Sequence, residues 1–164
     1  MSEGQLLVAQ EGPMALMQVI GRGTFKLAVG FRRWIEQLIA STEIHSVMLD
    51  LSKCASLDST FMGLMVTLAI QSKKRFALLV VNASENHHAL LDGIGVMRVW
   101  RYVDAPVPEL NWSNLAEAAS GSVALDDKTR ELIIAAHTTL MEYDEGNIPK
   151  FKDVVELMKE QKQS

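Results

Sequence analysis

The uninterrupted apolar run from Phe76 to Val81 sets the strongest limit on how this chain can fold. It has the length of one strand, and a run without polar alternation is typical of a strand that is buried on both faces. A second segment of strand length, 46–51, precedes a ten-residue apolar stretch from Phe61 to Ile70, which has the length of a helix. A helix between two such strands predicts an α/β fold, in which helices pack against a sheet.

The other segments before residue 105 continue this alternation. Gly12 and Pro13 supply turn geometry between two short apolar segments, which predicts a hairpin. From Phe25 to Ile39 the apolar residues recur at spacings of three, four and seven, which predicts an amphipathic helix. The full prediction has strands at 5–9, 14–20, 46–51, 76–81 and 99–103, and helices at 25–39, 59–75 and 84–91.

The composition shifts after residue 104, and we divide the chain into a sheet domain at 1–104, a linker at 105–121 and a helical extension at 122–164. Within this tail, 111–119 is predicted as a short helix and 120–122 as a flexible joint. Gly146 should end a longer helix, and Asn147 is predicted to cap a second one. The apolar face of the longer helix consists of Leu125, Leu132, Ile133, Ala136, Leu140 and Tyr143. Two helices alone cannot bury their apolar faces, so we expect them to pack on the sheet domain, on each other, or on a second subunit in a homodimer.

The composition excludes several classes of protein. A chain of 164 residues with 48% hydrophobic and 22% charged residues can build a core, and its net charge of −4 argues against a general nucleic-acid binder. The single cysteine, Cys54, cannot form an internal disulfide and is predicted to be buried packing. The N-terminus lacks the features of a signal peptide, and the longest apolar stretch is about half a membrane span. We therefore expect a cytoplasmic protein without membrane association.

Asp58, Ser59 and Thr60 lie where the strand segment has ended and the apolar helix begins. A hydroxyl in the first turn of a helix faces unpaired backbone N–H groups and the positive end of the helix dipole. Such residues are the ordinary choice for capping a helix, so a plain N-cap is one interpretation. A phosphate attached there would also meet a favourable field, so the hydroxyl is equally a candidate switch between two charge states.

Other motifs give weaker signals. The segment 21–23, Gly-Arg-Gly, lies between a strand and a helix, but a dinucleotide fingerprint needs a third glycine where Lys26 stands. His87 and His88 are neighbours on a predicted helix and so point to different faces, which argues against a zinc site. The cations at 73–75 suit a helix C-terminus. We therefore predict no metal, no cofactor and no enzyme activity.

Residues 50–64, Asp-Leu-Ser-Lys-Cys-Ala-Ser-Leu-Asp-Ser-Thr-Phe-Met-Gly-Leu, resemble the central motif of STAS domains, the family of anti-sigma factor antagonists. In that pattern a strand ending Asp-Leu-Ser precedes a helix that starts Asp-Ser-Ser/Thr-Gly-Leu-Gly. Residues 82–96 resemble the final helix of the family with its Leu-x-x-x-Gly-Leu ending. The resemblance covers about residues 5–104 and implies a STAS-like mixed sheet with helices packed against it. The helical region from about Leu110 onward lies outside it.

The resemblance implies a partner switch that regulates transcription. In such proteins the serine directly after the motif aspartate, here Ser59, is phosphorylated by an anti-sigma factor that is itself a serine kinase. The unphosphorylated form binds this kinase and frees the sigma factor, and a PP2C-type phosphatase resets the switch. Asp58 would then orient or cap the helix start, and Thr60 is the second choice of phospho-acceptor.

The helix after Ser59 has more apolar surface than packing on a sheet requires. Phe61, which replaces the glycine of the motif, and Met62, Met65 and Val66 are therefore predicted to contact a partner, unless the C-terminal helices cover them. Two alternatives stay open. One is a STAS scaffold in a signalling complex without a covalent switch, and the other is a nucleotide- or anion-binding module that uses the helix N-terminus at Ser59.

Overall fold

The computed structural model describes residues 4–118 and 125–163. Within these residues the chain forms one mixed sheet in the order β6-β5-β3-β2-β1-β7, with β4 paired to the end of β2. β1 runs antiparallel to β2 and to β7, and the other neighbouring strands are parallel. The strands are β1 Gly4–Glu11, β2 Met14–Gly23, β3 Ser46–Asp50, β4 Cys54–Leu57, β5 Ala77–Val81, β6 Arg101–Val103 and β7 Ser113–Glu117. The predicted α/β class and the mixed sheet are confirmed.

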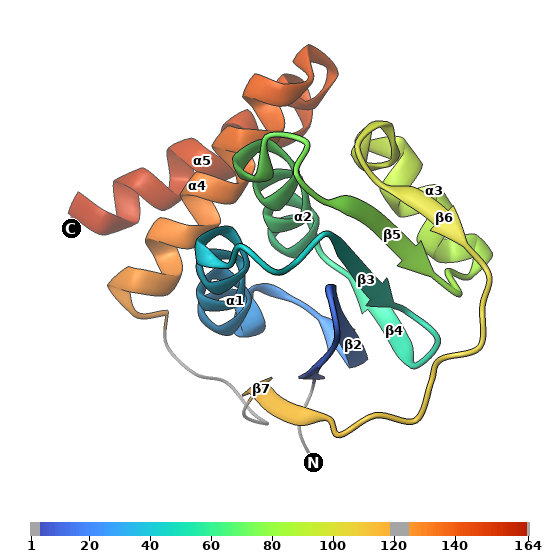
Figure 1. Cartoon of the computed structure of the whole chain (residues 1–164). Helices are drawn as coiled ribbons and strands as arrows, with labels where there is room; N and C mark the ends of the chain where they lie inside the picture. Colours follow the sequence, from blue (N-terminus) through green and yellow to red (C-terminus); the bar gives the residue numbers. More distant parts are fainter. Residues whose placement is uncertain (1–3, 119–124, 164) are drawn as a thin grey trace.

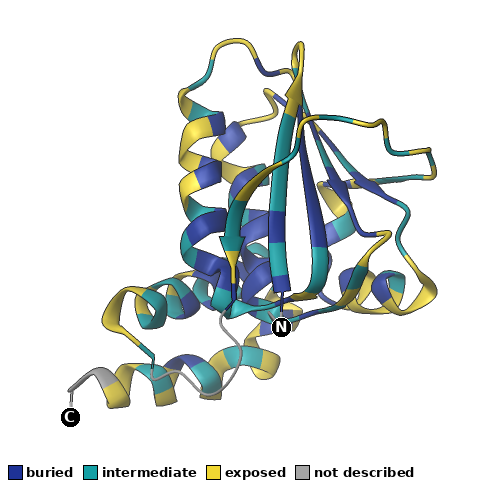
Figure 2. Ribbon diagram, turned by 90° about the horizontal axis from the view of Figure 1, so that it is seen from below, coloured by how far each residue is buried: buried dark blue, intermediate teal, exposed yellow. Residues whose placement is uncertain are grey.

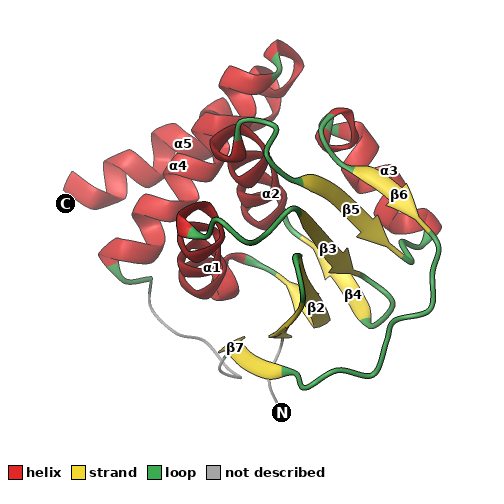
Figure 3. Ribbon diagram, in the orientation of Figure 1, coloured by secondary structure: helices red, strands yellow, loops and turns green. Residues whose placement is uncertain are grey.

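The helices stack outward from one face of this sheet. They are α1 Ala28–Ala40, α2 Ser59–Ser72, α3 Glu85–Gly93, α4 Asp127–Tyr143 and α5 Ile148–Gln163, with short 3-10 turns at η1 Phe25–Leu27, η2 Val96–Arg98 and η3 Glu145–Asn147. α1 and α2 lie side by side on the sheet, and α4 and α5 lie outside them, away from the strands (Figures 1 and 3). α2 is therefore enclosed between the sheet and α4.

The core lies between the sheet and the pair α1–α2. Alternate strand residues face this layer and are at most 1% exposed, among them Leu6, Met17, Val19, Val47, Leu49 and Val80. α1 contributes Phe31 and Ile35, and α2 contributes Phe61, Met65 and Leu68, all fully buried. Burial of each such side chain contributes about 1.5–3 kcal/mol. Figure 2 shows the buried residues gathered on these central strands and helices, while the outer helices carry many exposed residues. The core therefore holds α2 rigidly against the sheet.

Most of the predicted elements are present, with shifted ends. The hairpin turns at Gly12, whose φ of 57° lies in the left-handed region that favours glycine. α2 ends at Ser72 rather than at Arg75, because Lys73 and Lys74 adopt left-handed backbone angles that terminate the helix. The sequence did not predict β4, whose four residues pair with the end of β2.

The short helix predicted at 111–119 is wrong, because residues 113–117 form strand β7. This strand pairs with β1 and covers an edge of the sheet that would otherwise expose unpaired backbone groups. Its Ala116 packs close to α1, since a Cβ atom on Gly30 would lie only 2.5 Å from the Cβ of Ala116. Part of the predicted linker thus belongs to the sheet, and the division at 104 and 121 stays a prediction. The joint predicted at 120–122 lies outside the described residues.

The two C-terminal helices are present and pack on the rest of the chain. α4 ends at Tyr143, three residues before the Gly146 that was predicted to end it, and Leu125 precedes the helix. α4 lies against both α2 and α5. Of the packing options left open by the sequence, the structure therefore has two: contact with the sheet domain and contact between the two helices.

Candidate functional site

The start of α2 is fixed by Asp58, which caps the helix. Its carboxylate accepts two backbone N–H groups, from Phe61 at 2.9 Å and from Phe25 at 2.8 Å. Its own backbone N–H donates to the carbonyl of Gly23 at 2.9 Å. Burial raises the pKa of Asp58 above its ordinary value, while the N–H groups of Phe61 and Phe25 act in the opposite direction. The cap thus ties α2 to η1 and to the end of β2.

Ser59 follows this cap, and its hydroxyl lies against α4. Ser59 Oγ is 2.7 Å from Nε2 of His137, a side chain that is only 3% exposed. The other ring nitrogen, Nδ1, is 2.7 Å from the carbonyl oxygen of Ile133, which can only accept, so Nδ1 carries the proton. Burial lowers the pKa of His137 and favours the neutral ring, although the charge of Asp58 acts in the opposite direction. The neutral Nε2 accepts, so the Ser59 hydroxyl donates to His137.

α2 and α4 approach each other closely one turn further along. A Cβ atom on Gly63 would lie 2.6 Å from the carbonyl oxygen of Ala136 and 2.8 Å from its Cβ, so only glycine permits this separation. On α5, Phe151 contacts the ring of His137 edge-on, with 5.0 Å between the ring centroids. The start of α2 is therefore covered by α4, and α5 packs on the residue that contacts Ser59.

Two buried or half-buried side chains tie the other end of α4 to the segment that follows α3. The Tyr143 hydroxyl donates to the carbonyl of Gly95 at 2.8 Å. The side-chain amide of Asn147, which is fully buried, donates to the carbonyls of Ile94 at 3.1 Å and Leu140 at 3.0 Å. Asn147 directly precedes α5, as predicted for a cap, but its amide is committed to these two carbonyls. It therefore joins three segments of the chain.

Two exposed contacts reinforce this end. Arg98 of η2 forms an ion pair with Asp144, and Lys150 of α5 donates to the carbonyl of Gly93 at 2.6 Å. Exposed pairs of this kind add little stability individually. Together with Tyr143 and Asn147 they nevertheless define an attachment of α4 and α5 that is separate from the contact at Ser59.

Comparison with known families identifies the larger part of this chain. The sequence profile of the STAS domain matches residues 6–104. The chain belongs to the STAS domain family. Asp58, Ser59 and all of α2 lie inside the STAS domain, whereas β7, α4 and α5 follow it. Among curated proteins, none matches the sequence.

Three solved structures of anti-sigma factor antagonists are similar to this STAS protein, and two of them are forms of the same protein. They are the anti-sigma factor antagonist SpoIIAA in its unphosphorylated form, the Bacillus cell fate determinant SpoIIAA in the phosphorylated form, and an anti-sigma factor antagonist from Mycobacterium paratuberculosis. In that order the identities are 14%, 13% and 17%, and the TM-scores are 0.53, 0.52 and 0.54. The alignments cover 62%, 62% and 60% of this chain, and 88%, 91% and 85% of the other chains. At these identities the similarity shows the fold alone.

The other predicted site residues of the STAS domain are buried. Thr60 is 3% exposed, and the predicted partner contacts Phe61, Met62, Met65 and Val66 are between 0% and 4% exposed. The ring of Phe61 packs against Phe31 of α1, with 4.7 Å between the centroids. In this conformation none of these side chains is available to a partner, and Phe61 belongs to the core between α1 and α2.

His137 is the functional candidate that sequence analysis missed. It stands inside the predicted apolar face of α4, four residues after Ile133 and three before Leu140. A lone histidine in an apolar stripe signals burial and a need for a hydrogen-bond partner. Its partner is 78 residues away in sequence, and no local pattern identifies it.

Two further predictions about single residues can be compared with the structure. Cys54 is half-buried, its thiol donates to the carbonyl of Ser56 at 3.3 Å, and burial raises its pKa to about 11, which makes it a poor nucleophile. His87 is 3% exposed and completes a capping box at the start of α3, where its Nδ1 accepts from the Ser84 N–H at 3.0 Å. Both side chains therefore serve the packing of the STAS domain.

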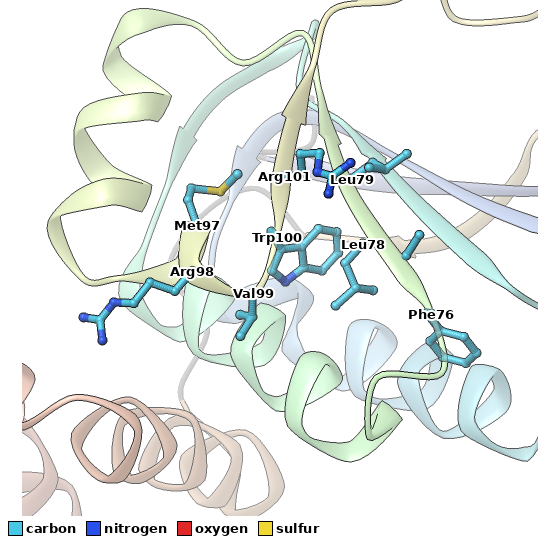
Figure 4. Close-up of a pocket in the computed structure, with 9 residues that line it drawn as sticks. Phe76, Leu78, Leu79, Met97, Arg98, Val99, Trp100 and Arg101 are labelled. Carbon is cyan, nitrogen blue, oxygen red and sulfur yellow. The ribbon is translucent and has the colours of Figure 1, made fainter.

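An open hollow of the described surface lies away from Ser59. It has a volume of about 460 Å³, lies between β5 and η2–β6 and includes Leu78 and Trp100, with Arg98 pointing away from it (Figure 4). Within residues 4–118 and 125–163, no cluster of three or more His, Cys, Asp and Glu side chains could hold a metal ion. No helix in the same ranges has the length and apolar character needed to cross a membrane. The Asp58 carboxylate acts against the anion-binding alternative at Ser59, because it already accepts the N–H of Phe61 and places a negative charge at the start of α2.

Proposed function

We propose that this STAS protein is an anti-sigma factor antagonist, a non-enzymatic regulator that changes partners when Ser59 is phosphorylated. The observation that carries the proposal is the position of the Ser59 hydroxyl, in the first turn of α2 and directly after the capping Asp58. The STAS resemblance implies a phospho-acceptor at this position, which supports the proposal. Thr60 is the second choice, although its side chain is buried.

A phosphate on Ser59 would change the charge of this surface strongly. It adds about −1.5 to −2 charges next to the carboxylate of Asp58. Repulsion between the two groups, together with the hydration of the phosphate, disfavours a protein surface docked over them. The positive end of the α2 dipole offsets part of the repulsion within the domain. We therefore expect the fold to survive phosphorylation while a docked interface is lost.

The structural comparisons support a fold that accommodates both states. SpoIIAA is similar to this chain in its unphosphorylated form with a TM-score of 0.53, and in its phosphorylated form with a TM-score of 0.52. The two forms thus resemble this chain to the same extent. A STAS domain can carry the modification without refolding its sheet.

The partners that follow from this proposal are an anti-sigma factor with serine kinase activity and a PP2C-type phosphatase, both acting in the cytoplasm. A homodimer through the C-terminal helices would have to use the outer surface of α5. Ile148 and Leu157 are 42% and 52% exposed there, while the apolar face of α4 is already buried against α2. The exposed side chains of α5 are therefore the surface on which a homodimer can be tested.

The test is phosphorylation in vitro by the serine-kinase anti-sigma factor of the same genome, with the phosphate mapped by mass spectrometry. We expect modification of Ser59 and none of the Ser59→Ala variant. The Ser59→Asp variant should bind the kinase at least about tenfold more weakly than Ser59→Ala, which corresponds to about 1.4 kcal/mol. Phosphate on another residue, or equal binding by the two variants, contradicts the proposal.

A second candidate function is a STAS scaffold without a covalent switch. The contact between Ser59 and His137 favours it, because the hydroxyl is already engaged inside the chain. A scaffold should bind its partners equally well as Ser59→Ala and as Ser59→Asp. Size-exclusion chromatography with light scattering on mixtures of the protein and its genomic neighbours would then give one complex of constant stoichiometry with either variant.

A further inference from the structure

The contact between Ser59 and His137 leaves no space for a phosphate. A separation of 2.7 Å between Oγ and Nε2 is that of two atoms in direct hydrogen-bond contact. A phosphorus atom and three oxygens bonded to Oγ cannot lie between them. Either the side chain turns away from α4 or α4 moves, and in both cases His137 loses its hydrogen-bond partner at Nε2.

Phosphorylation also removes the proton that Ser59 donates in this contact. In the transfer, the γ-phosphoryl group of ATP forms a bond to Ser59 Oγ, the bond to the β–γ bridging oxygen breaks, and ADP leaves. The hydroxyl proton passes to a base of the kinase, so Oγ has no proton left to donate. His137 Nε2 would then be a buried acceptor without a donor, which is costly. The new charge would lie beside the partly buried Asp58 carboxylate, at a surface that α4 covers.

Among the described residues, α4 covers the surface of α2 next to Ser59. The close approach of Gly63 and Ala136 places the two backbones in contact. On α4, Ile133, Ala136 and Leu140 are at most 4% exposed, and all three would be uncovered by separation of the helices. A kinase that must reach the Ser59 hydroxyl, and a partner that must read its charge, need this same surface.

We propose that phosphorylation of Ser59 and docking of α4 over the start of α2 exclude each other, with His137 as the residue that links them. The helical pair α4–α5 is then an internal competitor for the surface that external partners use. The inference rests on the proposed function only for the source of the phosphate. Because linkage between equilibria is reciprocal, docked α4 disfavours phosphorylated Ser59 by the same free energy by which the phosphate disfavours docking. A kinase that acts on the undocked state is slowed because docking lowers the population of that state.

The direct experiment places the phosphate without a kinase, by incorporating phosphoserine at position 59 during synthesis. Hydrogen exchange of the α4 amides is then compared with that of the unmodified chain. Coupling between linked sites is usually about 5- to 150-fold, and we expect α4 to exchange at least about tenfold faster. β3 and β5 should keep their protection. As a control for charge alone, phosphoserine at the exposed Ser113 of β7 should leave α4 unchanged.

Two outcomes of this experiment overturn the inference. One is unchanged exchange in α4 with the phosphate mapped at residue 59. The other is a loss of protection in β3 and β5 as large as that in α4, since the phosphate would then unfold the domain rather than release a helix. Neither outcome depends on whether a kinase modifies Ser59, so a failure of the proposed function remains distinguishable.

A second variant separates the helices without touching Ser59 or His137. Gly63→Ala places a Cβ atom within 2.6 Å of the α4 backbone, and Gly93→Ala is a matched control because no atom lies within 4 Å of its added Cβ. Gly63→Ala should be phosphorylated by the kinase about fivefold or more faster than Gly93→Ala. Equal rates for the two variants, with phosphate on Ser59 in both, would overturn the inference.

Discussion

The two ends of α4 are attached to the STAS domain in different ways. At the Ser59 end the attachment includes the side-chain hydrogen bond from Ser59 to His137 and the close contact at Gly63. At the other end Tyr143 and Asn147 donate to the STAS-domain carbonyls of Gly95 and Ile94, and two exposed charged contacts are added. The proposed release of α4 from Ser59 would therefore leave α5 and the far end of α4 attached.

The same comparison separates a regulated contact from a structural one. The carbonyls that accept from Tyr143 and Asn147 belong to the backbone, so the proposed phosphorylation of Ser59 does not alter these bonds. The same modification would remove the hydroxyl proton that Ser59 donates to His137. Four changes should affect the stability of the two ends of α4 to different extents.

Asn147→Ala should cause the largest loss of stability. It leaves the carbonyls of Ile94 and Leu140 without their side-chain donor and creates a cavity at a fully buried position, at a cost of about 2–4 kcal/mol. Urea denaturation measures the change, and hydrogen exchange should rise along both α4 and α5. The exposed Asn114→Ala is the control, with an expected change within about 0.5 kcal/mol. Equal stability of the two variants would mean that the contacts at Tyr143 and Asn147 are not the main attachment of α4 to the STAS domain.

His137→Ala should have the next largest effect, about 1–3 kcal/mol, because it removes the Ser59 contact and the ring contact with Phe151. Hydrogen exchange should rise in α4 up to about residue 137 and stay unchanged near Tyr143. The exposed His45→Ala controls for the loss of a histidine. Faster exchange along the whole of α4 would show that its two ends do not act separately.

Tyr143→Phe should cost about 0.5–1.5 kcal/mol, the net value of one hydrogen bond, because only the hydroxyl that donates to Gly95 is removed. The ring stays in place, so its contact with Arg98 is retained. Differential scanning calorimetry should detect a small decrease in Tm without a change in the phosphorylation rate of Ser59. A faster phosphorylation rate would place this end in the switch as well.

The smallest effect should come from lowering the pH from about 7 to about 5.5. Burial lowers the pKa of His137, so the unfolded chain binds more protons below its ordinary value of 6.5, and the free energy of unfolding decreases as the pH falls through that range. At the other end the pKa of Tyr143 is raised above 10.0 and that of Asp144 is lowered below 3.8, so neither group titrates there.

The pH effect has two internal controls. His137→Gln should flatten the dependence, whereas His87→Gln removes only the second histidine whose pKa is lowered by burial. The pKa of Asp58 is raised by burial and contributes with the opposite sign, since it favours the fold as the pH falls. A pH profile that is identical with and without His137 would exclude a neutral, buried imidazole at Ser59.

The sequence predicted those parts of the fold that depend on local patterns. The apolar run at 76–81 and the segment at 46–51 became β5 and β3, and the junction at Asp58 became a helix cap. β7 escaped prediction because its strand conformation depends on pairing with β1, more than a hundred residues earlier. The position of Ser59 could be read from the motif, but its engagement by His137 could not, because that contact exists only after α4 has packed.

The exclusion of docked α4 by a phosphate on Ser59 is tested most directly by NMR. His137 is titrated in the unmodified chain and in the chain with phosphoserine at position 59. In the unmodified chain the pKa of His137 should lie below its ordinary value, with Nδ1 protonated in the neutral ring. If phosphorylation releases α4, the pKa should return to about 6.5, the value of a solvated histidine. A pKa that stays low, or one well above 6.5 because the docked imidazole pairs with the phosphate, would contradict the claim that phosphate and α4 exclude each other.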